Sequence, residues 1–401
     1  MKSSARLETL RLTSGVFATD ARGVRAWLRK HTSAIVGLNL LGVIIVALVT
    51  PWVLWQLQPA RPLDVLVVDK TVSVDDYREH AGLTWLLRHE KITQRATGKL
   101  LDPEIDYAGA HYSPEGQRQL VGIPSRPTDF VYITDAYGIY GDPIGKPQRP
   151  NLIDGGISAD EVGMIVKNLK PRATFIGEFN ALASPTKREG REALERALGI
   201  RWTGWIGRHF DQLDRSGDLP AWMPRTWKRQ TGYAWRFRGP GYIFVSEEGR
   251  LVVLIEGIDT PDASISLELS KEAQERYGTR KRIVYDYWFD VVTPTKGSTV
   301  LASYRISLNP SGKVKARGVP LAGGLIPAVV RTDMPGYRAY YFAGDFADLK
   351  VQPSVERYRW YERFKGRFSE EVRDDQTAFY WRIFIPMMRR IVSDAVDRSR
   401  G

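Results

Sequence analysis

The chain contains one long apolar segment, Ser33–Leu57, with twenty-five residues and no formal charge. A helix needs about 20 apolar residues to cross a bilayer core. The apolar part of a cleaved signal peptide is shorter, about 7–15 residues. The segment also ends in Pro51, Trp52 and Trp55, which suit the aromatic belt of a membrane interface. This pattern predicts an uncleaved transmembrane signal anchor over residues 33–57, rather than a cleaved signal or a buried core helix.

The stretch before this apolar segment is basic. Residues 1–30 carry seven Lys or Arg and two acidic residues, a net charge of +5. The positive-inside rule places such a stretch in the cytoplasm. We therefore expect residues 1–32 to be a basic cytoplasmic tail and residues 33–57 to hold the chain in the cell inner membrane as a single-pass protein. The body after Arg61 is then periplasmic, or more generally extracytoplasmic.

Beyond Arg61, short apolar runs that end in polar residues alternate with helical patterns. The expected strands are Val65–Asp69, Phe130–Thr134 and Ala173–Ile176. The helical patterns cover residues 74–89, 158–168 and 184–198. In the second of them, Ser158 and Glu161 have the spacing of a capping box. Strands that alternate with helices predict a parallel sheet with helices on both faces, a three-layer α/β domain over residues 62–232.

The pattern changes after Tyr233. Residues 233–350 hold apolar runs with little helical pattern between them, including a hairpin signature with its turn near Glu248 and Gly249. We expect this β-rich part to complete the sheet or to form a subdomain. Residues 351–401 show a helical pattern interrupted by a proline. Within it, the aromatic and basic stretch Phe379–Val392 favours packing on the sheet over an amphipathic helix on the membrane surface.

The composition narrows the chemistry. The chain has no cysteine, which excludes disulfides, thiolate zinc sites and a Cys nucleophile. Its five histidines form no HExxH pair, and the sequence has no EF-hand, P-loop, GxGxxG or GxSxG pattern. We therefore predict neither a metal nor another cofactor. The formal net charge of +12 contains no long block of like charges, and an extracytoplasmic body disfavours nucleic acid as a partner.

Polar side chains follow each of the three predicted strands. They are Asp69 and Lys70, then Asp135, then Glu178 and Asn180, with Ser184 and Thr186 at the next predicted helix start. Ligands bind outside the carboxyl ends of the strands in an open parallel sheet, and a helix start attracts anionic or polar atoms. The alternative is that these residues are turn formers and caps. Three polar strand ends in succession favour a binding site. His80, on the first predicted helix, could orient a carboxylate or act as a base there, or it could lie exposed at the helix end.

Two further stretches carry candidate chemistry. Residues 202–235 contain five of the twelve tryptophans together with Arg208 and several acids, a mixture that suits sugar rings. Trp205 and Arg208 are the ligand-binding candidates there, and the alternative is that most of these tryptophans fill the core. The second stretch is Tyr341–Asp348, where Asp345 lies among apolar residues. A carboxylate in apolar surroundings has a raised pKa, so Asp345 is the candidate catalytic partner of Glu178, unless it caps a turn.

Four motifs occur in an order that resembles the class I glutamine amidotransferase-like, flavodoxin-like fold. They are VLVVDKTV, VYITDAYG, IGEFNALASPT and YYFAGDFAD, within residues 62–350. More narrowly, they resemble an uncharacterised group of membrane-anchored bacterial proteins with such a domain. The resemblance places Glu178 to Asn180 where the family has its Cys nucleophile, and Gly344 and Asp345 where it has its late His. It therefore implies a reused pocket without glutaminase activity.

Two hypotheses of function follow. In the first, the extracytoplasmic domain binds or processes an envelope glycan or a similar polar polymer through a pocket at the strand ends. If it is an enzyme, it is a carboxylate-based hydrolase in which Glu178 and Asp345 act as the pair. In the second, the domain is a non-catalytic scaffold or sensor with an envelope protein partner. A third hypothesis has the basic body docking on anionic lipid through the C-terminal helix.

Overall fold

The structure is a computed structural model that describes residues 21–72, 77–112, 118–140, 152–214, 218–261, 265–348, 353–372 and 375–400. The chain divides into two compact units, Met1–Gln56 and Leu57–Gly401, and each is described by itself. In the first unit, helix α1 spans Ala21–Leu57, and its part Val36–Leu57 is long and apolar enough to cross a membrane. The predicted apolar helix is therefore present. Residues 1–20 of the predicted tail lie outside the described residues, and the orientation of the anchor stays a prediction.

The second unit is built around one large mixed sheet. Within the described ranges it has ten strands, in the order β14-β13-β16-β17-β18-β9-β6-β2-β4-β5. Along the sheet these are Arg282–Val284, Ser266–Leu269, Thr299–Arg305, Leu325–Met334, Tyr337–Phe342, Leu169–Glu178, Thr128–Asp135, Val65–Asp69, Ala108–Tyr112 and Arg118–Val121. The block from β18 to β4 is parallel, and the strands on either side pair antiparallel. The expected parallel sheet is thus only the centre of a mixed α/β sheet.

A second sheet is wholly antiparallel and has, among the described residues, the four strands β12-β11-β10-β15. They are Leu251–Ile255, Gly241–Ser246, Ile200–Phe210 and Phe289–Pro294. Strands β11 and β12 form the hairpin that the sequence predicts. Strand β15 joins the two sheets, because the Asp290 N–H donates to the Ala343 carbonyl at 2.8 Å just beyond the end of β18. The short pairs β1 with β3 and β7 with β8 are Arg61–Pro62, Ile92–Thr93, Ile139–Tyr140 and Leu152–Asp154.

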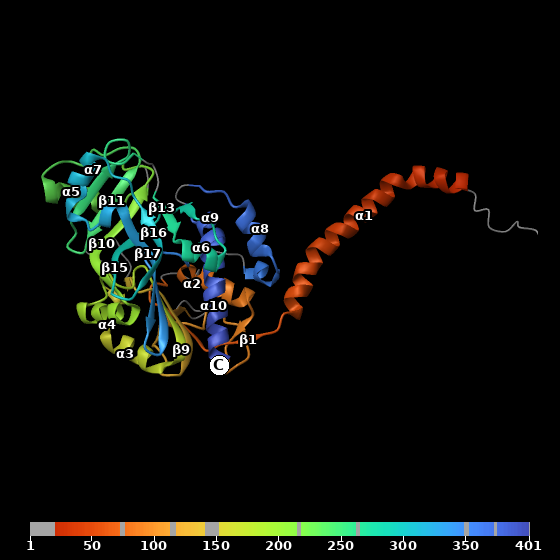
Figure 1. Ribbon diagram of the computed structural model, residues 1–401, viewed down its shortest axis with the longest axis horizontal. Helices are drawn as coiled ribbons and strands as arrows, with labels where there is room; N and C mark the ends of the chain where they lie inside the picture. Colours follow the sequence, from red (N-terminus) through yellow and green to blue (C-terminus); the bar gives the residue numbers. More distant parts are fainter. Residues whose placement is uncertain are drawn as a thin grey trace, which may run out of the picture. The chain divides into compact units, whose positions relative to one another are not determined.

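Helices cover both faces of the large sheet (Figure 1). Helices α2 (Arg78–His89) and α10 (Ile385–Arg400) pack on one face, and α3 (Ala159–Asn168) and α4 (Arg188–Leu198) lie on the other. The remaining helical segments are α5 Trp222–Thr231, α6 Lys271–Tyr277, α7 Pro310–Lys315, α8 Tyr361–Phe368, α9 Thr377–Phe379, the π-turn Tyr380–Phe384 and 3-10 turns at Ala316–Gly318, Ala322–Gly324 and Pro353–Arg357. Most apolar side chains of α10 are buried, so the stretch Phe379–Val392 packs against the sheet rather than presenting a free amphipathic face.

The structure agrees with the predicted start of one helix and differs from the predicted start of the next. Ser158 caps α3 with the full capping box: its hydroxyl accepts from the Glu161 N–H, and Glu161 accepts from the Ser158 N–H. The helix predicted from residue 184 instead begins at Arg188. The Thr186 hydroxyl donates to the Ala181 carbonyl and accepts from the Ile157 N–H, which holds residues 181–186 as a turn.

Helix α4 approaches the segment just before α3 through Gly190. A Cβ at this position would lie 1.8 Å from the Ile157 carbonyl oxygen. We expect Gly190→Ala to force α4 away from this segment and to lower the free energy of unfolding by about 1–3 kcal/mol. Gly163→Ala on α3 is the matched control, because its Cβ would meet nothing within 4 Å and should be neutral or slightly stabilising. Thermal melting of the full chain in detergent micelles measures both, and equal melting temperatures would refute the close approach.

Candidate functional site

The carboxyl ends of β2, β6 and β9 meet at one edge of the large sheet, since these strands are adjacent and parallel. Asp69 and Asp135 are register partners at this edge, and Glu178 ends the next strand. The loop after β18 adds Asp345 and Asp348, and the first turn of α2 adds Arg78 and Glu79. We name these residues, with Asn180 and Tyr287, the strand-end cluster. The sequence prediction that the strand ends converge is met in the geometry of the fold.

Glu178 is enclosed at the centre of the cluster, with none of its surface exposed. One carboxyl oxygen accepts from the Tyr132 hydroxyl at 2.7 Å, and the other accepts from the N–H groups of Phe346 and Ala347. Burial raises the pKa of Glu178 to about 8, and these hydrogen bonds offset part of that rise. The side chain therefore ties three segments of the sheet together and stays mostly protonated at neutral pH.

Asp345 lies next to this internal carboxyl and is half-buried. Its backbone N–H donates to the Tyr285 hydroxyl at 2.8 Å. Burial raises the pKa of Asp345 well above its ordinary value, and the charges of Asp348 and Glu178 raise it further. Asp345 thus combines partial access to solvent with a raised pKa.

A buried proton lies between Asp69 and His80. Both side chains are fully buried, and the His80 Nδ1 lies 2.5 Å from the Asp69 Oδ2. The other ring nitrogen of His80 lies 2.7 Å from the Pro103 carbonyl, which can only accept. That nitrogen must therefore carry a hydrogen, and the Nδ1–Oδ2 contact needs one more proton, on either partner. His80 thus orients the Asp69 carboxyl, the first of the alternatives for this residue.

Asp135 and Asn180 form the middle of the cluster. The Asp135 carboxyl accepts from the Thr71 hydroxyl and the Tyr137 N–H, both at 2.6 Å, and from the Asn180 amide at 3.2 Å. Burial raises the pKa of Asp135 to about 7, against these hydrogen bonds. Asn180 has a left-handed backbone with φ 65°, which aims its amide at Asp135 from the end of β9. Asn adopts this conformation more readily than most residues.

The open rim of the cluster carries donors and an aromatic ring. The exposed Arg78 guanidinium lies 2.7 Å from the Asp348 carboxyl. Burial, with the charges of Asp345 and Asp348, raises the pKa of Tyr287 to about 12, so its phenol remains a hydrogen-bond donor. Arg208 reaches this ring from β10 of the second sheet, with its guanidinium carbon 5.0 Å from the ring centre. Burial also raises the pKa of Glu79 to about 8.

Four predicted site residues do not join the cluster. The Lys70 ammonium donates to the Gly156 carbonyl at 3.0 Å and pairs with Glu161 at 2.7 Å, so it anchors the start of α3. Thr186 is buried as a turn residue, and Ser184 is exposed beside it. Trp205 is buried in the core between its neighbours on β10. Lys70, Thr186 and Trp205 therefore have local structural roles, as the alternative to a binding site predicts.

Several residues of the cluster are not predicted from the sequence. Arg78 and Glu79 stand in the first turn of the helix after β2, and Asp348 ends the motif that drew attention to Asp345. Tyr287 enters from the segment between β14 and β15, which only the paired sheets bring close. The sequence does contain one indication of Arg78 and Glu79 as site residues, because both directly precede His80. Despite the many carboxyls, the described residues contain no group of three or more His, Asp or Glu side chains with the geometry of a metal site.

Comparisons with known proteins give no family for this chain. A scan against protein-family models finds no match, and neither does a search of curated proteins. Among solved structures, a GH42 β-galactosidase from G. stearothermophilus has a TM-score of 0.32 and 9% identity, covering 77% of this chain and 30% of its own. A carbohydrate deacetylase has a TM-score of 0.32 and 9% identity, covering 71% of this chain and 30% of its own. A ThuA-like protein from Bacteroides uniformis has a TM-score of 0.30 and 10% identity, covering 75% of this chain and 89% of its own. At these scores the likenesses show neither the fold family nor the function of this chain.

Proposed function

We propose that this chain is a membrane-anchored extracytoplasmic protein that binds an envelope glycan or a similar polar polymer at the strand-end cluster. The proposal keeps the flavodoxin-like, class I glutamine amidotransferase-like assignment for the domain, without glutaminase activity. The parallel block from β18 to β4 with helices on both faces supports that assignment. The apolar helix Val36–Leu57 supports the membrane anchor.

The observation that carries the proposal is the mixture of groups on the rim. A sugar hydroxyl both donates and accepts, so its site needs donors and acceptors side by side. The raised pKa of Asp345 favours the protonated carboxyl, which offers both, while Arg78 and the Tyr287 phenol add donors. The Tyr287 ring also provides a flat face beside Arg208 for the C–H groups of a sugar ring.

The two-carboxylate mechanism fits the geometry poorly. Glu178 has both oxygens occupied by internal donors and no exposed surface, so neither a sugar carbon nor a water reaches it. We assign Glu178 a structural role and place any acid–base chemistry on Asp345, which is half-buried. Binding is therefore the primary function proposed, and processing would run through Asp345 alone as the acid.

Replacing Asp345 tests this function. We expect Asp345→Ala to weaken binding about tenfold or more, because it removes both the donor and the acceptor that the carboxyl offers. The measurement uses the full chain in lipid nanodiscs on an array of neutral and acidic oligosaccharides that includes peptidoglycan fragments. The control is Asp397→Ala, an exposed carboxyl on α10. Unchanged binding in Asp345→Ala, or no glycan bound by the natural chain, would refute the proposal.

One observation favours the second candidate, a scaffold or sensor in an envelope assembly. By the resemblance, Glu178 stands at the position of the amidotransferase nucleophile. Here its carboxyl forms three internal hydrogen bonds. A scaffold would show a stable protein partner in cross-linked membranes, retained in Asp345→Ala. Loss of glycan binding with an intact partner complex would separate the two functions.

A further inference from the structure

Helix α8 leaves a row of large apolar side chains in solvent. Trp360, Phe364 and Phe368 are 45%, 58% and 67% exposed, and the next apolar residue at this spacing, Val372, is also exposed. Phe364 and Phe368 lie four residues apart on one face of α8, with their ring centres 4.8 Å apart, while Trp360 directly precedes the helix and Val372 follows its end. We name Trp360, Phe364, Phe368 and Val372 the aromatic row. Contiguous exposed apolar surface of this kind marks an interaction site.

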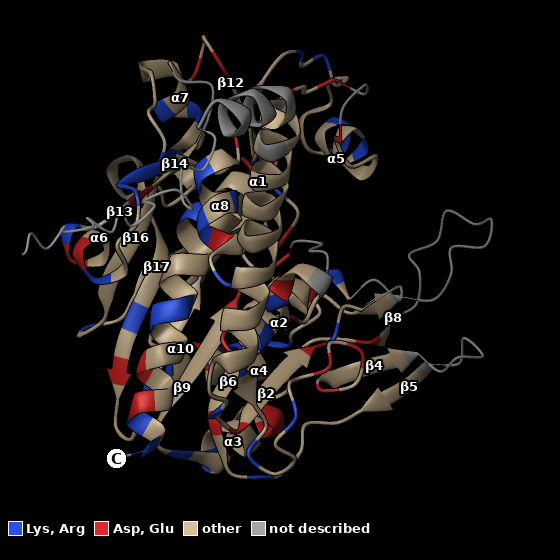
Figure 2. Ribbon diagram, turned by 90° about the vertical axis from the view of Figure 1, so that its right-hand side faces the viewer, with Lys and Arg blue, Asp and Glu red and all other residues tan. Residues whose placement is uncertain are grey.

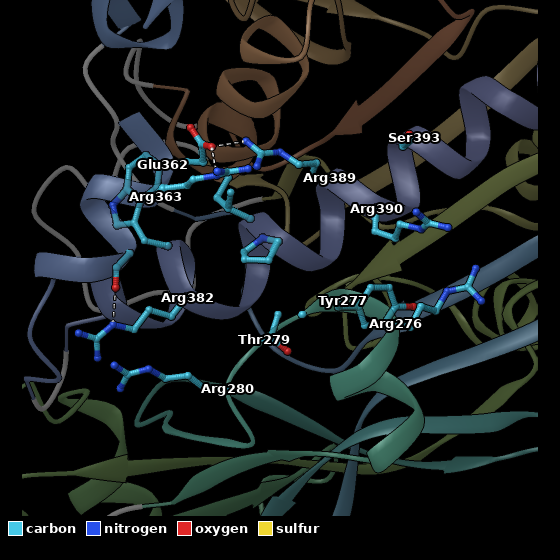
Figure 3. Close-up of a pocket in the computed structure, with 15 residues that line it drawn as sticks. Arg276, Tyr277, Thr279, Arg280, Glu362, Arg363, Arg382, Arg389, Arg390 and Ser393 are labelled. Carbon is cyan, nitrogen blue, oxygen red and sulfur yellow. Dashed lines mark hydrogen bonds and ion pairs between the residues drawn. The ribbon is translucent and has the colours of Figure 1, made fainter. Parts of the chain in front are cut away.

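Basic side chains surround the aromatic row. Arg363, Lys365 and Arg367 are on α8 itself, and Figure 2 shows Lys and Arg along α8 and α10 in blue. Behind α8 lies a groove of 570 Å³ between α8, α10 and the loop after α6 (Figure 3). We name it the arginine groove, after the guanidinium groups that line it: Arg276, Arg280, Arg363, Arg382, Arg389 and Arg390.

The arginine groove has more positive than negative charge. Its carboxylates are shared: Asp394 pairs with two of the arginines, Glu371 with two more and Glu362 with the last two. Glu90 pairs with Arg389 and also with Arg61 from outside the groove. Seven guanidinium groups against four carboxylates leave three positive charges in this network. Guanidinium is the side chain best matched to phosphate oxygens.

The segment just before α8 is hydrogen-bonded to Gln58, the residue that follows the apolar helix in the chain. The Arg359 guanidinium donates to the Gln58 side-chain carbonyl at 2.6 Å, and the Lys91 ammonium donates to the Gln58 backbone carbonyl at 2.8 Å. Gln58 directly follows Leu57, the last residue of the candidate span. When that span crosses a bilayer, Gln58 lies at its surface, and the aromatic row begins one residue after Arg359.

We infer that α8 docks on an anionic bilayer, with the aromatic row in the interfacial region and the arginine groove on the phosphates of the lipid headgroups. An amphipathic helix with aromatic residues on one face and Arg or Lys beside them binds membranes in this way. The anionic lipid supplies the negative charge that the groove lacks. The apolar contact with lipid thus belongs to α8, while α10, whose apolar side chains are buried against the sheet, contributes only polar groups of the groove such as Arg389 and Arg390.

The test places a spin label on the aromatic row. The natural chain has no cysteine, so Phe364→Cys gives one labelling site in the full chain. The control is Val314→Cys on α7, which is exposed to a similar degree. In nanodiscs of phosphatidylcholine with phosphatidylglycerol, we expect collisions of the 364 label with a water-soluble nickel complex to be roughly tenfold rarer than those of the 314 label. Equal accessibility of the two labels would overturn the inference.

A second variant tests the groove. Arg280→Gln with Arg390→Gln removes two largely exposed guanidinium groups. We expect the protection of the 364 label to be stronger with phosphatidylglycerol than with phosphatidylcholine alone, and this difference to disappear in the double variant. Inorganic phosphate that binds the groove while the 364 label stays in water would reveal a soluble-anion site and overturn the docking. Spin–spin broadening between labels would reveal a second copy of the chain on the row, which also overturns it.

Discussion

Glu178→Ala is expected to lower the free energy of unfolding by roughly 4 kcal/mol. The change leaves the N–H groups of Phe346 and Ala347 and the Tyr132 hydroxyl buried without their acceptor. Each buried donor without a partner costs about 1–3 kcal/mol, and a cavity adds to the loss. Thermal melting of the full chain in detergent micelles measures the effect, with Glu192→Ala on the exposed face of α4 as the control.

Glu178→Gln is expected to stay within about 1 kcal/mol of the natural chain at neutral pH. Because burial raises the pKa of Glu178 to about 8, the natural side chain is mostly a neutral acid at pH 7. A glutamine reproduces that acid: its oxygen accepts from the two N–H groups, and its amide, like the O–H of the protonated acid, donates to the Tyr132 oxygen, the reverse of the bond that the ionised carboxylate accepts from Tyr132. If Gln destabilises as much as Ala, or Ala costs nothing, the internal tie assigned to Glu178 is wrong.

Stability should fall as the pH rises from about 5 to 8. Burial raises the folded-state pKa of Glu178 to about 8 and that of Asp135 and Asp290 to about 7, each well above its unfolded value. Between the two values the folded state holds a proton that the unfolded state has lost. Each such group lowers the free energy of unfolding by about 1.4 kcal/mol per pH unit. The stabilisation is complete below the unfolded pKa and lost as the pH passes the folded pKa.

The measurement is the melting temperature of the full chain in micelles at pH 5, 6, 7 and 8. One excess proton corresponds to roughly 2 °C per pH unit for a body of this size. Asp135→Asn should reduce the slope, because the amide does not titrate. Glu362 acts in the opposite direction: the Arg389 guanidinium and His89 hold its pKa at about 2, against burial, so its stabilisation is lost only in strong acid. A flat profile from pH 5 to 8 would contradict the raised pKa values.

Local signals predicted the elements that form locally. The β-branched run Val65–Asp69 is a strand with the predicted bounds, and Ser158 caps α3 as its spacing indicates. Polar residues at the ends of adjacent parallel strands converge by topology, so Asp69, Asp135 and Glu178 were found together from the sequence. These inferences need only the local pattern and the rule that parallel strands share an edge.

Pairing between distant segments could not be predicted in the same way. Lys70 has the position of a site residue, but its ammonium group forms an ion pair with Glu161 on α3. Trp205 lies in a stretch whose composition suits sugar binding. In the structure its side chain is buried in the core, because β10 pairs with a strand on each side. Tyr287 reaches the cluster because β15 contacts the end of β18, a contact without a local signature. The sequence pattern identifies the residue types, and long-range packing decides which of them meet.

Strand β18 has a consequence for how the protein is made. It lies inside the large sheet and pairs with β9, so that Phe342 is opposite Glu178 although more than 160 residues separate them. Until β18 has been synthesised, β9 has an open edge in the middle of the sheet. At a synthesis rate of about 5–20 residues per second, that edge stays open for on the order of 10 s. Open edges are templates for aggregation, so the nascent chain would need protection by a chaperone until β18 has been synthesised.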